Sequence, residues 1–129
     1  MGGARFPVAA RIVRPADFVR LRRAGQRVSA RYFNAQATTG AADIARLGLA
    51  VSRRVSVDAV RRNRIKRIVR ESFRRIRSDL PALDILLIAR ETADAQDNAT
   101  LRADLDTLWP RLADLASLNG SRRPGTMRA

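Results

Sequence analysis

The residues with the clearest chemical character are the basic ones between positions 53 and 77. This stretch holds 11 basic side chains against Asp58 and Glu71, a net charge of +9 in 25 positions. Lys66, Arg70 and Arg74 follow one another at four-residue spacing, so on a helix these like charges would repel one another. Phosphate groups would relieve that repulsion, because a planar guanidinium group can bind a phosphate through two hydrogen bonds. The pattern therefore predicts a surface that binds nucleic acid.

The overall composition also indicates a polyanionic partner. The 129-residue chain has 26 basic and 12 acidic residues, which gives a formal net charge of +14. Residues 1–78 carry a net charge of +16, whereas residues 79–129 carry −2. The length fits one domain, which we expect over residues 1–119, with residues 1–10 flexible. Residues 120–129 offer almost nothing to bury and are predicted to form a disordered tail.

Several kinds of chemistry are excluded by residue types that the chain lacks. It has no Cys and no His, so disulfides, thiolate or imidazole zinc sites and His general bases are absent. The acids of the basic half, Asp17, Asp43, Asp58 and Glu71, do not have the spacing of a metal site. We therefore expect no cofactor or metal bound by the protein alone. With no apolar run for a membrane span and no secretory signal, we expect no membrane partner and a cytoplasmic location.

The elements that position the basic stretch follow from local patterns. Pro15 suits the first position of a helix and Gly25 can close one, which predicts a short helix over 15–24. Residues 27–30, 32–38 and 46–52 are predicted as strands. A helix over 58–79 is predicted because its apolar side chains share one face and Pro81 ends it. These side chains are Ile65, Ile68, Val69, Phe73 and Ile76.

After that helix, residues 84–89 form a continuous apolar run typical of a strand covered on both faces. The order strand, helix, strand predicts a crossover unit. A C-terminal helix, which Pro110 should kink, is predicted to close the core through leucines that advance by four and three residues. These leucines are Leu101, Leu105, Leu108, Leu112 and Leu115.

On a helical wheel, the polar side chains of the basic helix gather in a sector of roughly 100° opposite the apolar stripe. They are Asn63, Lys66, Arg67, Arg70, Arg74 and Arg77. A solvated helix face is the simplest alternative, but the charge density and the missing acids disfavour it. An amphipathic membrane-surface helix is disfavoured because its apolar side chains are needed for the core.

Residues 46–55, 59–71 and 84–90, in this order and spacing, resemble the signature blocks of the bacterial ribonuclease P protein family. The most specific block runs from Arg62 to Arg67. With Asp17, Phe18 and Gly25 upstream, the likeness covers about residues 11–115. The chain departs from the family's pattern where Arg53 and Arg54 replace paired lysines. It also differs near Ser56, where members have a glycine, and at Arg22, where relatives carry an aromatic residue.

The resemblance implies an α/β (α+β) two-layer sandwich in the order helix, three strands, helix, strand, helix. It also implies a left-handed β-α-β crossover around the basic helix, whereas general topology would favour a right-handed one. The implied function is that of the protein subunit of ribonuclease P, a ribonucleoprotein endonuclease that removes the 5′ leader of precursor tRNA. In that family the catalytic centre and its Mg²⁺ ions belong to the RNA, so the resemblance implies no catalytic residue in this chain.

The implied partners are the catalytic RNA, one protein per RNA, and the precursor tRNA. The residues implied to contact the catalytic RNA are Arg53, Arg54, Arg62, Asn63, Arg64, Lys66, Arg67 and Arg70. A cleft between the sheet and the first helix would hold the single-stranded leader, with Phe18, Tyr32 and Phe33 as candidate stacking platforms. Tyr32 and Phe33 are neighbours on a strand and point to opposite faces, so at most one of them lines the cleft.

Three other functions are compatible with parts of the pattern. A ribosomal or other structural RNA-binding protein would have the same charge and would purify with ribosomal RNA. A protein nuclease would cleave precursor tRNA by itself, but the acids are not spaced for its metal site. A DNA-binding protein would show the same attraction to a polyanion, but the chain has no helix-turn-helix or zinc-finger pattern.

Overall fold

The computed structural model describes residues 11–12, 15–39 and 44–120. Its elements follow the predicted order of helix, three strands, helix, strand and helix, with two short 3-10 helices added. They are α1 (Pro15–Ala24), β1 (Gln26–Ser29), β2 (Phe33–Thr39), β3 (Arg46–Ala50), α2 (Ala59–Ile76), η2 (Arg77–Asp79), β4 (Leu83–Ala89), η3 (Glu91–Ala95) and α3 (Asn98–Gly120). The predicted bounds of α1 are confirmed, and the strand ends differ from the prediction by one or two residues.

The four strands form one mixed sheet in the order β1-β2-β4-β3. β2 pairs antiparallel with both β1 and β4, while β3 pairs parallel with β4. The predicted crossover unit is therefore present, with α2 connecting the two parallel strands. Beyond β3, Arg11 forms an isolated bridge with Leu47, and the backbone N–H of Ile12 donates to the Leu47 carbonyl at 2.9 Å. The hand of the crossover stays a prediction from the resemblance.

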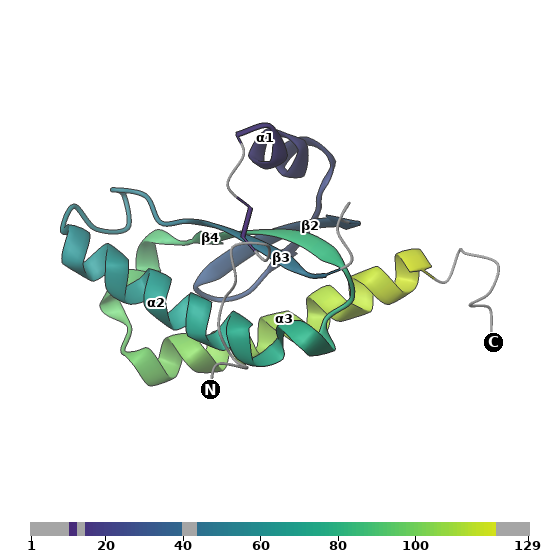
Figure 1. Ribbon diagram of the computed structural model, residues 1–129. Helices are drawn as coiled ribbons and strands as arrows, with labels where there is room; N and C mark the ends of the chain where they lie inside the picture. The colour runs from purple at the N-terminus through teal and green to yellow at the C-terminus, as the bar shows by residue number, and fades with distance from the viewer. Residues whose placement is uncertain (1–10, 13–14, 40–43, 121–129) are drawn as a thin grey trace.

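The sheet separates two layers of unequal size: α2 and α3 cover one face, and α1 lies on the other (Figure 1). The side chains of β2 alternate between these two faces of the sheet. Phe33, Ala35 and Ala37 are buried toward α2 and α3, whereas Asn34 and Gln36 point to the α1 side. β4 is buried along almost its whole length, as predicted for a strand with both faces covered.

The long helix α2 begins where Asp58 caps it, since its carboxylate accepts a hydrogen bond from the Val60 N–H at 2.9 Å. The predicted apolar stripe faces the core: Ile65, Ile68, Val69 and Phe73 are all buried. The opposite side of α2 is thereby fixed toward solvent, so the core determines which way the basic residues point.

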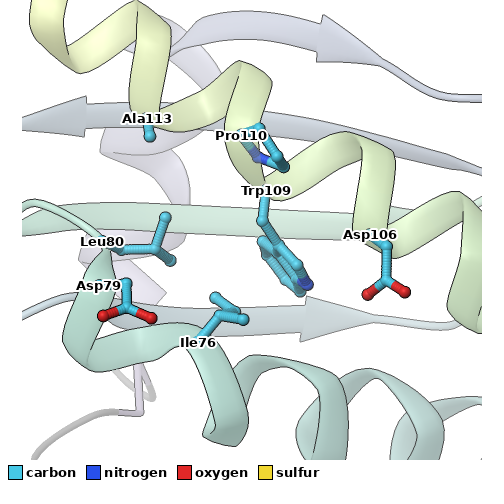
Figure 2. A pocket seen from close by; sticks show the side chains of 7 residues that line it. All are labelled: Ile76, Asp79, Leu80, Asp106, Trp109, Pro110 and Ala113. Carbon is cyan, nitrogen blue, oxygen red and sulfur yellow. The ribbon is translucent and has the colours of Figure 1, made fainter.

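The C-terminal helix α3 closes the larger core with Leu101, Leu105, Leu108 and Leu112, none of which has exposed surface. Trp109 lies between α3 and the end of α2, beside Ile76 and Leu80 (Figure 2). Its indole Nε1 donates to the Ser72 hydroxyl at 2.8 Å.

The helix continues through Pro110 to Gly120, one residue into the predicted tail. The rest of that tail lies outside the described residues, as do residues 1–10, and the predicted kink at Pro110 stays a prediction. Within the described ranges, no helix has the length and apolar character to cross a membrane.

A smaller core holds α1 on the sheet. Leu21 and Ile12 pack with Leu86 of β4, and the half-buried Phe18 packs against them. The ring of Phe18 lies directly over Gly48 of β3, where an added Cβ would be only 2.8 Å from its Cε1 atom. The missing side chain at Gly48 is what lets an aromatic ring approach the strand backbone.

Candidate nucleic-acid interface

The outward face of α2 carries the predicted cationic surface. Asn63, Arg67 and Arg70 are exposed, and Lys66 and Arg74 are partly exposed. Arg53 and Arg54 are exposed in the turn that precedes the helix. Glu71 is the single acid of α2. We call the group Asn63, Lys66, Arg67, Arg70 and Arg74 the basic face; it lies opposite the buried stripe, as the helical wheel predicted.

Two residues of the most specific sequence block are held within the fold. Arg62 and Arg64, which the resemblance implies as contacts of the catalytic RNA, each form hydrogen bonds within the chain. Arg62 is partly buried, and its Nη1 donates to the Ser56 carbonyl at 2.9 Å. Arg64 is also partly buried, and its guanidinium donates to acceptors of the segment between η3 and α3. A sequence pattern could not show this, because the acceptors of Arg64 lie about thirty residues further along the chain.

The side of the sheet that carries α1 contains a hollow of about 440 Å³. Its lining comprises Asn34, Ser52, Arg54, Ile88, Ala89, Arg90, Glu91 and Thr92. Arg54, which the resemblance grouped with the catalytic-RNA contacts, therefore borders this hollow. Together with Arg90 it supplies two cations there against one acid, Glu91, so the hollow can attract an anion.

Two amide oxygens on this side of β2 are buried and lack hydrogen-bond partners. They are Asn34 Oδ1, which borders the hollow, and Gln36 Oε1, and neither finds a donor in the part of the chain that the structure describes. A buried acceptor without a donor costs about 1–3 kcal/mol, so this polar face of β2 is costly for the fold itself.

The structure changes our view of the aromatic candidates. Phe33 has no exposed surface and packs in the core under α2 and α3, so its proposed contact with the leader is wrong. Tyr32 is partly buried and packs against the same larger core, with its backbone N–H donating to Asp104 Oδ2 at 2.7 Å. Phe18 packs with the smaller core on the α1 side. Of the three, it is the one whose surroundings match a cleft beside α1.

Asn34, Ile88 and Arg90 were missed by the sequence reasoning, which searched for aromatic platforms. The alternation in β2 contained a usable signal, because polar residues at 34, 36 and 38 follow a period of two. That pattern indicates a strand face that no apolar layer covers completely.

The position of α1 over the sheet is secured by a buried carboxylate. Asp84 of β4 has no exposed surface, and it accepts hydrogen bonds from Arg46 Nε at 2.8 Å and Arg46 Nη2 at 2.7 Å. Arg20 of α1 also donates to it, and Asp17 lies 3.6 Å from Arg20. Burial alone would raise the pKa of Asp84, but the hydrogen bonds from Arg46 and Arg20 outweigh it and hold the pKa below 3.8.

Fold and surface together define a class: an α+β sandwich that presents one rigid basic helix face and a separate basic hollow, as expected of an RNA-binding protein. Within the described ranges, no group of three or more acids could hold a metal ion. Residues 6–113 match the Ribonuclease P family. The chain belongs to the ribonuclease P protein family.

Relatives and solved structures agree with this membership. The chain is 37% identical over 108 residues to the ribonuclease P protein component of Thioalkalivibrio sulfidiphilus, covering 84% of this chain and 90% of that protein. The Halorhodospira halophila protein is 42% identical over 106 residues, covering 81% and 87%. The Staphylococcus aureus RNase P protein superposes with a TM-score of 0.73 at 35% identity, covering 76% of this chain and 90% of that one. The Thermotoga maritima protein gives 0.71 at 33% identity, covering 78% and 96%.

Proposed function

We propose that this chain is the protein subunit of ribonuclease P and that it binds the RNA subunit through the basic face of α2. The observation that carries the proposal is the exposure of Asn63, Arg67 and Arg70 on a helix whose other side is locked into the core. Because the core fixes this face of α2 toward solvent, only the side chains, and not the helix, have to be ordered at the moment of binding. A structured polyanion would remove the repulsion among them.

We place the 5′ leader of the precursor tRNA in the hollow on the α1 side. Arg54 and Arg90 would contact phosphates there, and the side chain of Asn34, which also lines the hollow, would hydrogen-bond to the leader. Single-stranded RNA is commonly recognised in this way, through base edges and stacking on side chains. Phe18, on the same side of the sheet, is the candidate aromatic contact.

In this proposal the phosphodiester bond is cleaved by the RNA subunit with its Mg²⁺ ions, while the protein docks and positions. The protein's net charge of +14 would also reduce the repulsion between the RNA subunit and its tRNA substrate. One protein would bind one RNA, and the complex would act in the cytoplasm, where precursor tRNA is processed.

Reconstitution tests the proposal. The full chain, freed of RNA, is combined with a bacterial ribonuclease P RNA and assayed for 5′ cleavage of a precursor tRNA at near-physiological Mg²⁺. We expect cleavage by the complex, slower cleavage by the RNA alone and none by the protein alone. The chain should also bind this RNA more tightly than ribosomal RNA fragments of equal length. Cleavage by the protein alone, or equal affinity for both RNAs, would show that the assignment is wrong.

A further inference from the structure

Arg64 lies within the sequence block that suggests RNA contact, yet its guanidinium group is bound to the protein itself. Nη1 donates to the Asn98 side-chain oxygen at 2.7 Å. Nη2 donates to the backbone carbonyls of Gln96 at 3.1 Å and Asp94 at 3.2 Å. Three acceptors thus share the two outer nitrogens, which a phosphate would need for a bidentate contact. A phosphate could take both only by displacing these partners.

The three acceptors belong to one corner of the chain, where η3 ends and α3 begins. Carbonyls at the end of a helix lack partners within that helix, so an external donor is needed to satisfy them. Arg64 provides such donors to Asp94 and Gln96. The corner is held in place by packing and by a helix cap. Ala93 has no exposed surface, and Asp97 caps α3 by accepting a hydrogen bond from the Thr100 N–H at 2.8 Å.

Arg61, one helical turn earlier, binds the same corner. Its Nε lies 2.9 Å and 3.0 Å from the two carboxylate oxygens of Asp94, and its Nη2 donates to the Asp94 carbonyl at 3.2 Å. Arg61 is more exposed than Arg64, so its ion pair should be the weaker of the two attachments. Both side chains leave α2 beside the buried stripe, whereas Arg67 and Arg70 leave it on the solvent side.

We propose that Arg64 is a positioning residue of the RNA-binding surface: it ties the first turns of α2 to the η3–α3 corner and does not itself bind phosphate. This inference rests on the proposed function of the basic face. Its consequence is that Asn98, on α3 and outside the basic face, contributes to RNA affinity through Arg64. Misplacing the first turns of α2 would move Asn63 and Arg67 relative to the phosphates that they contact.

The test measures the affinity of the full chain for a bacterial ribonuclease P RNA over a range of salt concentrations. The variants are Arg64→Lys, Arg64→Ala, Asn98→Ala and the double variant Arg64→Lys/Asn98→Ala, with Arg67→Ala as the phosphate-contact control. We expect Arg67→Ala to lower the slope of log K against log salt concentration by about one. Arg64→Lys keeps the charge but cannot reach three acceptors with a planar fork, so affinity should fall about threefold to tenfold at an unchanged slope.

Asn98→Ala should weaken binding in the same direction, again at an unchanged slope. The double variant should lose less affinity than the two single losses combined, because both remove one contact. All affinities are taken at a temperature where circular dichroism shows each variant to be folded, so that loss of fold cannot imitate loss of positioning.

Full affinity in Arg64→Lys together with a neutral Asn98→Ala would overturn the proposal, because the contact between Arg64 and the corner would then not affect RNA binding. A slope lowered by about one in an Arg64→Ala variant would do the same. If wild type itself shows no preference for this RNA and Arg67→Ala leaves the slope unchanged, the proposed function fails as well. That result is distinct from a failure confined to Arg64.

Discussion

At the scale of single residues, the fold depends on a few charged and small side chains whose roles are set by their surroundings. Asp84 is a fully buried acid, yet two arginines make it a stabilising group that joins α1 to the sheet. Gly48 is needed because it has no side chain, so that the Phe18 ring can lie on the strand. These residues determine how α1 is held on the sheet.

Asp84 should make the stability of the protein depend on pH at the acidic end. Its pKa in the folded protein is held below the ordinary 3.8. The stabilisation is therefore complete above pH 3.8 and is lost as the pH falls through the lower folded value. We expect Asp84→Asn to reduce the free energy of unfolding at pH 7 by about 1–3 kcal/mol, because Arg46 and Arg20 lose their charged partner but remain partly exposed.

The measurement is denaturant unfolding between pH 7 and pH 2. Below pH 4 the difference between wild type and Asp84→Asn should shrink, since the wild-type carboxylate becomes protonated. A difference that stays constant down to pH 2 would contradict this role. Asp58→Asn, which alters an exposed cap, serves as the control for general effects of removing an acid.

Gly48→Ala tests whether the packing of the Phe18 ring requires a strand position without a side chain. The new Cβ would lie 2.8 Å from Phe18 Cε1 and 3.3 Å from Ile12 Cβ, so the ring must move. We expect a loss of about 1–3 kcal/mol in the free energy of unfolding from this overpacking. Ala50→Gly at the end of the same strand is the opposite change and reports the backbone effect alone. Unchanged stability in Gly48→Ala would mean that α1 can shift without cost.

At the scale of elements, α3 does more than close the core. Its Asp104 carboxylate accepts the backbone N–H groups of Arg31 at 3.0 Å and Tyr32 at 2.7 Å, which fixes the turn between β1 and β2. Arg111 reaches the same hairpin through a 2.6 Å hydrogen bond to the Ser29 carbonyl. The acidic C-terminal part of the sequence is thus tied to the basic N-terminal part by contacts that no local pattern could indicate.

Asp104→Ala should therefore destabilise the protein, whereas Asp106→Ala should not. Asp104 satisfies two backbone donors, and removing it should lower the free energy of unfolding by about 1–2 kcal/mol. Asp106 is exposed on the same helix and serves as the matched control. Thermal and denaturant unfolding compare the two. Equal effects would show that the loss of negative charge, and not the loss of hydrogen bonds, decides the outcome.

The elements themselves were well predicted by periodicity and terminators, because these signals are local. Pro15 and Gly25 marked the ends of α1, and the apolar spacing of α2 and α3 identified their buried faces. The errors arose where tertiary contacts decide. Phe33 was taken for a binding platform because a strand sequence does not tell which face is covered by helices. The hydrogen bonds of Arg64 to the corner between η3 and α3 could not be predicted either, because these partners become its neighbours only when α3 packs beside α2.

At the scale of the whole molecule, the net charge of +14 acts together with its distribution. The basic face belongs to α2, and α3, whose sequence contains Asp104, Asp106 and Asp114, lies in the same layer of the fold (Figure 1). Two effects on RNA could follow: contacts of individual cations with phosphates, and a general attraction that depends on total charge alone. The two effects predict different outcomes for variants with equal charge.

Two double variants distinguish individual phosphate contacts from the general attraction of the total charge. Arg67→Gln/Arg70→Gln removes two charges from the basic face, and Arg75→Gln/Arg102→Gln removes two charges beside the acids Glu71 and Asp106. We expect the first pair to lower the slope of log K against log salt concentration by about two, since each phosphate contact contributes about 0.9. The second pair should leave that slope nearly unchanged, because those arginines lie next to compensating acids.

In the reconstituted complex, the first pair should also raise the Mg²⁺ concentration needed for half-maximal 5′ cleavage, and the second should not. If both pairs shift the Mg²⁺ requirement equally, then total charge, and not the rigid face of α2, is what the RNA responds to.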